Sequence, residues 1–210
     1  GIGANAAIFG VVQTMLFRAS PLPQPETLVN IYVTVGGRGF NPMSHPNIED
    51  LRKGTTQVFS GIAASTFFPA PVDVGGSVRI VMGEVVTGGA FALLGVEPLL
   101  GRAILPEDDV SRGGHPVVML SYGYWQSAFG ADPHLVGRTL RLGGRAYTII
   151  GVAPAQYRGA LPPLTPAFYV PMAMVNELMG VDMLDQRNAH SLFVKARLAH
   201  GVTRAQAEHT

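Results

Sequence analysis

The chain has 210 residues, enough for one large or two small domains and for a substantial hydrophobic core. Charged residues make up only 14%, the formal net charge is +1 and the mean hydropathy is +0.26, which favours contact with a membrane or a partner and argues against nucleic-acid binding. The absence of cysteine excludes disulfides, thiolate metal sites and a cysteine nucleophile, but does not fix the compartment.

The first segment, residues 1–17, carries no charge, and Arg18 ends the apolar run before a cluster of prolines. A membrane-spanning helix needs ~20 apolar residues. We therefore expect residues 1–18 to be the C-terminal part of a transmembrane helix that begins before Gly1. A signal peptide is the main alternative, but it would need a basic start and a small-residue cleavage site, and neither is present. Gly1-Ile-Gly-Ala-Asn-Ala6 also matches the pattern of a dinucleotide-binding loop, but such a loop would have to follow a strand.

Strand and helix patterns alternate after the prolines. Residues 44–53 predict a short helix, because Ser44 can cap it and Pro46 lies in its first turn. A second short helix is expected over residues 90–94, ended by Gly95. The strand candidates of this part are residues 28–35, 58–68 and 78–86.

The block from Val117 to Pro154 contains the only tryptophan and the densest set of structural signals. Residues 117–120 predict a buried strand, and Ser121 is placed to cap a helix that Gly130 ends. Three aromatic residues share one face of this helix: Tyr122, Trp125 and Phe129. We interpret them as the contact between helix and sheet; an exposed platform for a ligand is the alternative.

A hairpin follows the helix, because residues 139–142 and 145–150 resemble strands and Gly143-Gly144 joins them. Glycine accepts the positive φ that tight hairpin turns require. A last strand is expected over residues 191–198, and residues 202–208 predict a helix capped by Thr203 that the chain leaves incomplete. Mixed elements without a repeating βαβ period predict an α+β fold.

No catalytic, cofactor-binding or metal-binding set of residues is predicted. Met119 stands where a G-x-S-x-G elbow around Ser121 needs glycine, so Ser121 is interpreted as a cap. The six histidines lack metal-ligand spacing, and no phosphate-binding P-loop motif occurs. Residues 107–109 are acidic but lack the spacing of a calcium loop, so we interpret them as a solvated turn. Four arginines could line a site for an anionic ligand, and scattered surface charge is the alternative interpretation: Arg38, Arg79, Arg102 and Arg112.

A series of short segments occurs in an order and spacing that one known family shares. They are Gly1-Ile-Gly-Ala-Asn-Ala-Ala-Ile-Phe9, Pro46-Asn-Ile-Glu-Asp-Leu-Arg52, Phe59-Ser-Gly-Ile-Ala63, Gly83-Glu-Val-Val-Thr87, Phe91-Ala-Leu-Leu-Gly-Val96, Gly101-Arg102, Pro106-Glu-Asp108, Leu120-Ser-Tyr-Gly-Tyr-Trp125, Phe129-Gly-Ala-Asp-Pro133, Ile150-Gly-Val-Ala-Pro154 and Gly201-Val202. In these segments the chain resembles the MacB-type periplasmic core domain of ABC transporter permeases, especially the duplicated orphan permeases common in acidobacteria. The departures are small: Gly143-Gly144 stands where Asn-Gly is common and His45 where tyrosine is usual.

The resemblance implies a porter-like mixed α/β subdomain, residues 24–90 plus 186–210, with a smaller inserted α/β subdomain, residues 91–185. It implies a domain on the periplasmic side of the bacterial inner membrane, attached through its N-terminal helix, that couples cytoplasmic ATP hydrolysis to substrate export by conformational change. The implied partners are a cytoplasmic ABC ATPase, a periplasmic adaptor, an outer-membrane channel and a second copy in the full-length homodimer. No enzymatic activity and no cofactor are implied.

Two other functions stay open at this point. One is a permease-like regulatory protein that transmits the state of an ATPase to a periplasmic partner, either a cell-wall hydrolase or a lipoprotein carrier. The other is a membrane-anchored periplasmic binding module. The sequence does not identify the transported substrate.

Overall fold

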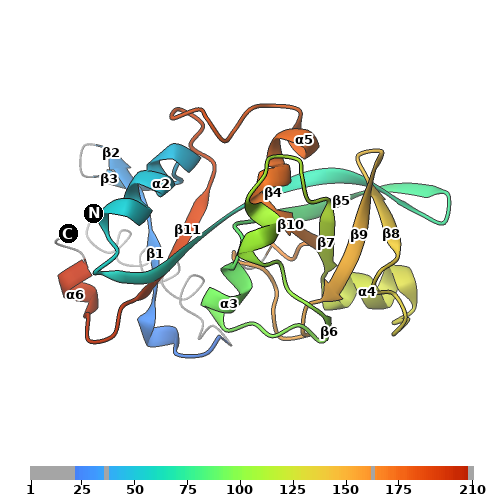
Figure 1. Cartoon of the computed structure of the whole chain (residues 1–210), viewed down its shortest axis with the longest axis horizontal. Coiled ribbons are helices and arrows are strands. Elements are labelled where there is room, and N and C mark those ends of the chain that lie inside the picture. Colours follow the sequence, from blue (N-terminus) through green and yellow to red (C-terminus); the bar gives the residue numbers. More distant parts are fainter. Residues whose placement is uncertain (1–21, 36–37, 162–163, 208–210) are drawn as a thin grey trace, which may run out of the picture.

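The computed structural model describes residues 22–35, 38–161 and 164–207. One long twisted sheet has the strand order β1-β11-β4-β5-β10-β7-β9-β6, with β8 paired to both β4 and β9 (Figure 1). Its strands are β1 (Leu28–Ile31), β4 (Phe59–Val74), β5 (Ser77–Val86), β6 (Leu100–Gly101), β7 (Val117–Leu120), β8 (Thr139–Leu142), β9 (Arg145–Val152), β10 (Phe168–Pro171) and β11 (Phe193–Leu198). A separate pair contains β2 (Val33–Val35) and β3 (Arg38–Asn41).

Short helices cover the sheet. The α-helices are α2 (His45–Gly54), α3 (Ala90–Leu94), α4 (Tyr122–Phe129), α5 (Val175–Met179) and α6 (Arg204–Ala207); the 3-10 helices are η1 (Pro25–Thr27), η2 (Pro106–Asp109) and η3 (Met172–Met174). This mixture of one sheet with few helices confirms the predicted α+β class. Among the described residues, no helix is long and apolar enough to cross a membrane. The helix expected over residues 1–18 lies outside the described residues.

Strand β4 runs the length of the molecule and extends beyond the predicted end at residue 68. Its first part pairs with β11 as far as Ser65, and its far end pairs with β8 at Val72 and Asp73. Between these two regions, β4 pairs only with β5 in the described part of the sheet, so its other edge is free there. Proline is tolerated on the free edge of a strand, which explains why Pro69 and Pro71 do not end β4.

Two local predictions near the start of the chain differ from the structure. The strand expected over residues 28–35 divides at Tyr32, because β1 pairs with β11 while β2 turns away to pair with β3. Helix α2 forms where expected, but the Ser44 side chain does not cap it. The Ser44 hydroxyl is instead buried without a hydrogen-bond partner among the described residues.

The two faces of the sheet bury different sets of side chains, because successive residues of a strand point to opposite faces. One face, here called the apolar face, packs Ala64, Phe68, Val72, Leu120 and Phe168 into the larger hydrophobic cluster. Side chains from α2, α4 and α5 join this cluster. The other face, here called the α3 face, packs residues such as Ala63, Met119 and Tyr169 beneath α3.

The central block of the sequence folds as its local signals predict. The Ser121 hydroxyl accepts a hydrogen bond from the Tyr124 amide at 3.3 Å, and Gly130 ends α4 with φ of 60°. Trp125 is buried in the apolar cluster, against which Tyr122 and Phe129 are packed. The hairpin between β8 and β9 turns at two glycines with φ of 58° and 83°, which confirms the predicted tight turn.

The two ends of the described chain are joined to each other. Strand β1 is antiparallel to β11, with Leu28 opposite Arg197. The Arg197 guanidinium donates to the Thr27 hydroxyl at 2.6 Å and to the carbonyl of Leu93 in α3 at 2.8 Å. Arg204 of α6 donates to the carbonyl of Glu26 at 3.2 Å and to that of Pro25 at 3.3 Å. The predicted cap of α6 is supported by a 3.3 Å hydrogen bond from the Gln206 amide to the Thr203 hydroxyl.

Candidate functional site

A row of polar side chains crosses the α3 face. The register aligns Asn30 of β1 with Lys195 of β11, and Glu84 of β5 with Tyr169 of β10. Ser65 of β4 lies between them and two residues from Ala63, the partner of Lys195, so it points to the same face. We call these five residues the polar row. It links the terminal strands of the sheet to its centre.

Glu84 is the most unusual member of the polar row, because its side chain is fully buried. Both of its carboxylate oxygens accept from a single donor, the Ala160 amide, at 3.2 and 3.4 Å. Burial raises the pKa of Glu84 to about 7, although the Ser65 hydroxyl, the Ala160 amide and the charge of Lys195 all act to lower it. The protonated and ionised forms of this buried carboxyl are therefore close in free energy near neutral pH.

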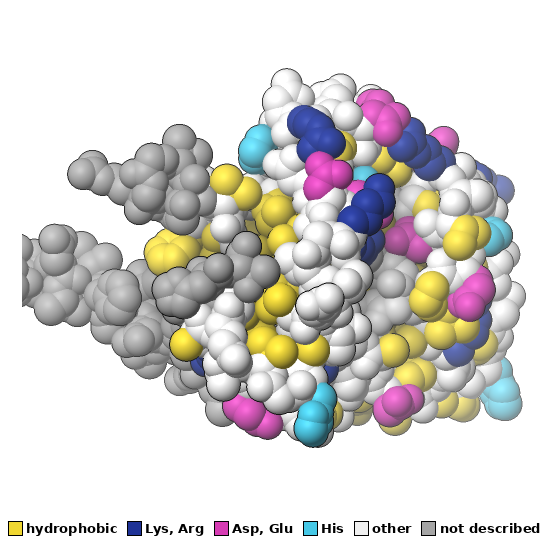
Figure 2. Space-filling view, turned by 60° about the vertical axis from the view of Figure 1, so that its left-hand side comes forward, with side chains coloured by type: hydrophobic (Ala, Val, Ile, Leu, Met, Phe, Trp, Pro, Cys, Tyr) yellow, Lys and Arg dark blue, Asp and Glu magenta, His cyan; other side chains and the backbone are white. Residues whose placement is uncertain are grey.

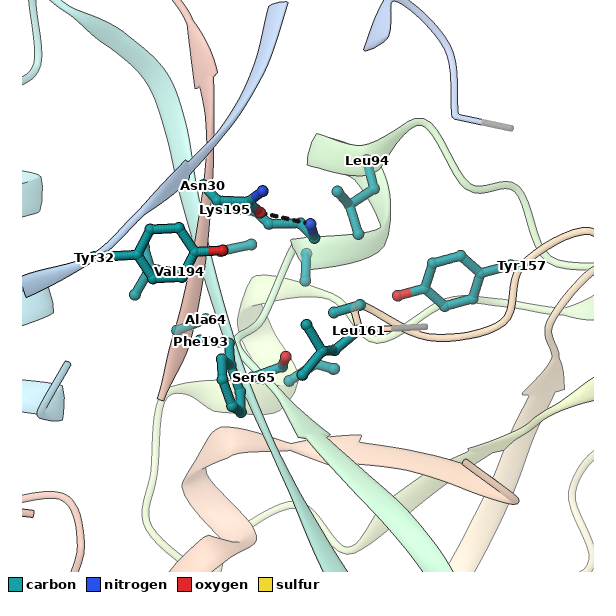
Figure 3. Close-up of a pocket in the computed structure, with 14 residues that line it drawn as sticks. Asn30, Tyr32, Ala64, Ser65, Leu94, Tyr157, Leu161, Phe193, Val194 and Lys195 are labelled. Atoms are coloured by element: carbon teal, nitrogen blue, oxygen red, sulfur yellow. Dashed lines mark hydrogen bonds between the residues drawn. The ribbon is translucent and has the colours of Figure 1, made fainter. Parts of the chain in front are cut away.

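Lys195 supplies the positive charge of the row without contacting Glu84 in an ion pair. Its ammonium donates to the Asn30 side-chain oxygen at 2.7 Å (Figure 3). Burial lowers the pKa of Lys195, and the charge of Glu84 partly restores it. Lys195 and Asn30 line a pocket whose walls are mainly apolar, including Leu94, Leu161 and Phe193.

Hydroxyl groups complete the polar surroundings of Glu84. Ser65 acts on the pKa of the carboxyl, yet its hydroxyl has no hydrogen bond of standard geometry among the described residues. The Tyr169 hydroxyl is likewise buried and unpartnered in the described part of the chain. Burial, together with the charge of Glu84, raises the pKa values of Tyr157 and Tyr169 well above 10, so both remain neutral. Figure 3 shows the Tyr157 hydroxyl directed towards the pocket.

The segment that covers Glu84 depends on one glycine. Gly159 has φ of +93°, a conformation that other residues rarely adopt, and a Cβ at this position would lie 2.9 Å from Glu84 Oε2 and 2.8 Å from Pro166 Cδ. Glycine therefore allows the main chain to approach the carboxylate and to present the Ala160 amide. Tyr157, in the same segment, packs edge-to-face against Phe91 of α3.

The acidic residues of η2 are structural, and the prediction of a solvated turn there is wrong for two of the three. Asp108 is buried and forms a two-bond pair with Arg102 at 2.6 and 2.9 Å. Burial alone would raise the pKa of Asp108, but the bonds from Arg102 and the Leu105 amide lower it. Asp109 accepts from the Gly88 amide at 2.8 Å and from the Ala173 amide at 2.6 Å. It thereby joins the segment before α3 to η3.

The other sequence candidates whose side chains the structure describes do not converge on one site; the side chain of Arg38 is not among them. Arg102 and Arg112 are engaged in separate ion pairs, with Asp108 and Asp185, and the charge of Arg79 acts on Tyr124 of α4. Ser121 is occupied as a helix cap. His45 contacts the Leu184 carbonyl at 3.2 Å and lines a separate polar hollow with Glu49, Arg52 and Asp109, whose charged groups all have hydrogen-bond partners.

Among the described residues, no group of three or more His, Cys, Asp or Glu side chains is arranged so that it could hold a metal ion. The face in Figure 2 mixes Lys and Arg side chains with Asp and Glu and presents no broad patch of one sign. The sequence analysis missed Glu84 as a site residue. The available signal was that Glu84 is the only charged residue in the strand segment 83–87.

The comparisons with known proteins agree with this architecture. The family model described as the MacB-like periplasmic core domain matches residues 1–210. No curated protein matches the chain. Among solved structures, the periplasmic region of MacB from Actinobacillus actinomycetemcomitans is similar with a TM-score of 0.68 and 16% identity, covering 94% of this chain and 85% of that one.

Two further structures show the same fold. The extracellular domain of the noncanonic ABC-type transporter YknZ from Gram-positive bacteria has a TM-score of 0.60 and 16% identity, over 83% of this chain and 84% of that one. A domain of a protein described as a permease from Porphyromonas gingivalis has a TM-score of 0.62 and 14% identity, and the match covers 90% of this chain and 82% of that one. The chain therefore belongs to the family of MacB-like periplasmic core domains of ABC transporter permeases.

Proposed function

We propose that the chain is the extracytoplasmic domain through which a permease of the bacterial inner membrane couples cytoplasmic ATP hydrolysis to substrate export by conformational change. The observation that carries this proposal is the junction between the two ends of the described chain. A domain inserted between two membrane helices receives their motion through its two connections, and hydrogen-bonded contacts between these connections can pass that motion into the domain. The junction of η1, β1, β11 and α6 supports this role, because it joins the two ends of the described chain.

Arg197 and Arg204 form the centre of that junction. Arg197 contacts both η1 and α3, and Arg204 contacts the carbonyls of η1 from α6. Guanidinium groups suit this role because several donors are held in a fixed plane. A displacement of η1 or α6 is thereby passed to β11 and α3 together.

We further propose that residues 24–90 plus 186–210 form the porter-like subdomain and that residues 91–185 form the inserted one. Strand β4 supports a mechanical link between them, since it pairs with β11 near one end and with β8 near the other. The proposed partners are a cytoplasmic ABC ATPase, a periplasmic adaptor, an outer-membrane channel and a second copy of the full-length permease. The domain itself is proposed to be non-enzymatic.

The proposal is tested by measuring distances in the full permease assembled with its ATPase in lipid nanodiscs. The chain contains no cysteine, so in a full permease in which any cysteine outside these 210 residues is replaced, Lys53→Cys on α2 and Gly123→Cys on α4 introduce two selective spin-label sites at exposed positions. We expect the distance distribution between the labels to differ between the nucleotide-free and ATP-trapped states. An unchanged distribution would count decisively against a coupling role and in favour of a binding module.

A matched pair of variants then tests the junction. Replacing Arg197 and Arg204 by alanine should abolish the ATP-dependent distance change while ATP binding is retained. The control is Arg138→Ala, which removes an exposed ion pair with Asp132 far from the junction and should leave the change intact. Deletion of residues 40–190 in the full protein distinguishes an exporter from a regulatory protein. Loss of export supports the permease. Loss of cell-wall hydrolysis or of lipoprotein transfer alone supports the regulatory alternative.

A further inference from the structure

We propose that Glu84 and residues 157–160 form a proton-operated latch, in which the segment stays closed over the pocket while Glu84 is protonated and is released when Glu84 loses its proton. This inference concerns the domain itself and does not rest on the proposed function. It begins from a mismatch between the closed geometry and an ionised carboxylate at its centre.

The closed site provides too few donors for a charged carboxylate. An ionised carboxylate offers about four acceptor positions, whereas in the described structure only the Ala160 amide and the Ser65 hydroxyl act on Glu84 as hydrogen-bond donors. Lys195 is directed to Asn30 instead, and no salt bridge between Lys195 and Glu84 occurs among the described residues. A buried charge without matching donors is unstable compared with the same charge in water.

Little water reaches Glu84 while the segment is closed, because its side chain is fully buried. The adjoining pocket has a cavity volume of about 20 Å³, which is room for only one or two water molecules. Its lining includes the Ser65 and Tyr157 hydroxyls, but the side chains of Leu94, Leu161 and Phe193 provide no donors to a carboxylate. Ionised Glu84 therefore becomes hydrated only if residues 157–160 move away from it.

The protonated form fits the closed site better. A neutral carboxyl becomes a donor, and the Ser65 hydroxyl beside it is a buried acceptor without a partner. The carbonyl oxygen of the neutral carboxyl still accepts from the Ala160 amide. Protonation thus removes the buried charge while the carboxyl keeps a hydrogen bond with each of these two neighbours.

The groups that face Glu84 from each neighbouring element allow this titration to be isolated. They are Lys195 from β11, Ser65 from β4, Tyr169 from β10 and Tyr157 from the covering segment, while α3 contributes no titratable side chain. Both tyrosines stay neutral, and burial lowers the pKa of Lys195 while the charge of Glu84 raises it. Glu84 is the member of this set whose pKa lies at about 7.

The expected size of the effect follows from the two environments. Burial raises the pKa of Glu84 from 4.5 to about 7 in the closed state, and opening restores the lower value. The ratio of closed to open molecules should therefore fall by up to about 300-fold between pH values below 4.5 and above 7.

The test is amide proton NMR of the 210-residue chain, with exchange rates corrected against an unstructured reference peptide. The Ala160 amide shift should titrate with a midpoint between 4.5 and about 7, because release of the segment draws the midpoint below the pKa of the closed form. The protection of this amide from exchange should fall as the pH rises from 5 to 8. Glu84→Gln should abolish both effects. The control Glu97→Gln changes an exposed carboxyl and should leave both unchanged.

Several results would overturn the latch. They are protection that is the same at both pH values, protection that rises with pH, or an identical pH response in wild type and Glu84→Gln. Should Glu84→Gln fail to fold, Lys195→Met gives an independent measurement. Loss of the positive charge that lowers the pKa of Glu84 should move the midpoint of the Ala160 titration upwards, and a midpoint that stays or falls would refute the proposal.

Discussion

The two faces of the sheet are buried in different ways. The apolar face is covered by α2, α4 and α5 and contains large side chains such as Phe168, Leu120 and Trp125. The α3 face is covered by one short helix and the segment around Tyr157, and the polar row crosses it. Adjacent residues of β10 illustrate the contrast, because Phe168 enters the apolar cluster and Tyr169 lies opposite Glu84.

This difference means that one face stabilises the fold and the other responds to pH. Apolar burial is nearly independent of pH, so the apolar face fixes the fold under all ordinary conditions. The α3 face contains a carboxyl whose charge changes near neutral pH and a cover that relies on a glycine. A moderate change of conditions can therefore alter one face while the other keeps the sheet intact.

Removal of a large side chain from the apolar face should have the largest effect. Phe168 is fully buried and packs edge-to-face on Phe68, with ring centroids 5.9 Å apart. Phe168→Ala should lower the free energy of unfolding by about 3–5 kcal/mol, measured by urea denaturation at pH 5 and pH 8. The loss should be equal at the two pH values; a strongly pH-dependent loss would contradict the separation of the faces.

Glu84→Gln should change the pH dependence of stability. Because the pKa of Glu84 in the folded protein lies above its value of 4.5 in the unfolded chain, its stabilising contribution is complete below pH 4.5 and is lost as the pH rises through about 7. Relative to its effect at pH 4, the variant should gain up to about 3 kcal/mol at pH 8, measured by urea denaturation at both values. An effect that is equal at the two pH values would show that Glu84 titrates normally.

Asp109 links the two faces, because it accepts from Gly88 before α3 and from Ala173 in η3. Asp109→Ala leaves both amides without an acceptor and should cost about 2 kcal/mol. Asp109→Asn is the matched control, since its single amide oxygen can replace only one of the two bonds and should cost about half as much. Equal stability of wild type and Asp109→Ala in thermal denaturation would rule out the link.

Ser121 tests a feature that belongs to the apolar face alone. Ser121→Ala removes the cap of α4 and should cost about 1 kcal/mol. Ser127→Ala on the exposed side of the same helix should have almost no effect. Amide exchange should increase in the first turn of α4 while Ala160 is unaffected, and a matching increase at Ala160 would show that the faces are coupled.

The smallest effects are expected from two buried hydroxyls, one on each face. Tyr147 packs in the apolar cluster and Tyr169 under α3, and neither hydroxyl has a partner among the described residues. Tyr147→Phe and Tyr169→Phe should each stabilise the protein by less than about 1 kcal/mol, because a group without a hydrogen bond is removed. A clear destabilisation at pH 5 in Tyr169→Phe alone would show that protonated Glu84 uses this hydroxyl.

Local sequence signals predicted the elements whose determinants lie within a few residues of each other. Ser121, Gly130 and Gly143-Gly144 act through neighbouring backbone, so β7, α4 and the following hairpin were predicted correctly. The cap at Ser44 failed, because the same residue type can be buried without capping. A serine before a helical pattern therefore predicts where the helix starts more reliably than it predicts a hydrogen bond from the helix to the serine side chain.

The polar row could not be predicted from local patterns. Glu84 approaches Ala160 and is influenced by Lys195, which are distant in sequence and meet only because β5 and β11 flank β4 and the covering segment returns over them. The division of residues 28–35 at Tyr32 and the extension of β4 past Pro69 likewise depend on which strands are available as partners. The motif search found no reactive constellation, and a single buried carboxyl leaves no motif.

The pairing of β4 with β11 also has a consequence during synthesis. Ser65 pairs with Phe193, so this edge of β4 has no partner until residue 193 has been made. At the usual rates of about 5–20 residues per second, the 128 residues from 66 to 193 take roughly 6 to 26 s. During that time an edge rich in alanine and phenylalanine is open to pairing with other chains, and a factor that shields it would raise the yield of folded protein.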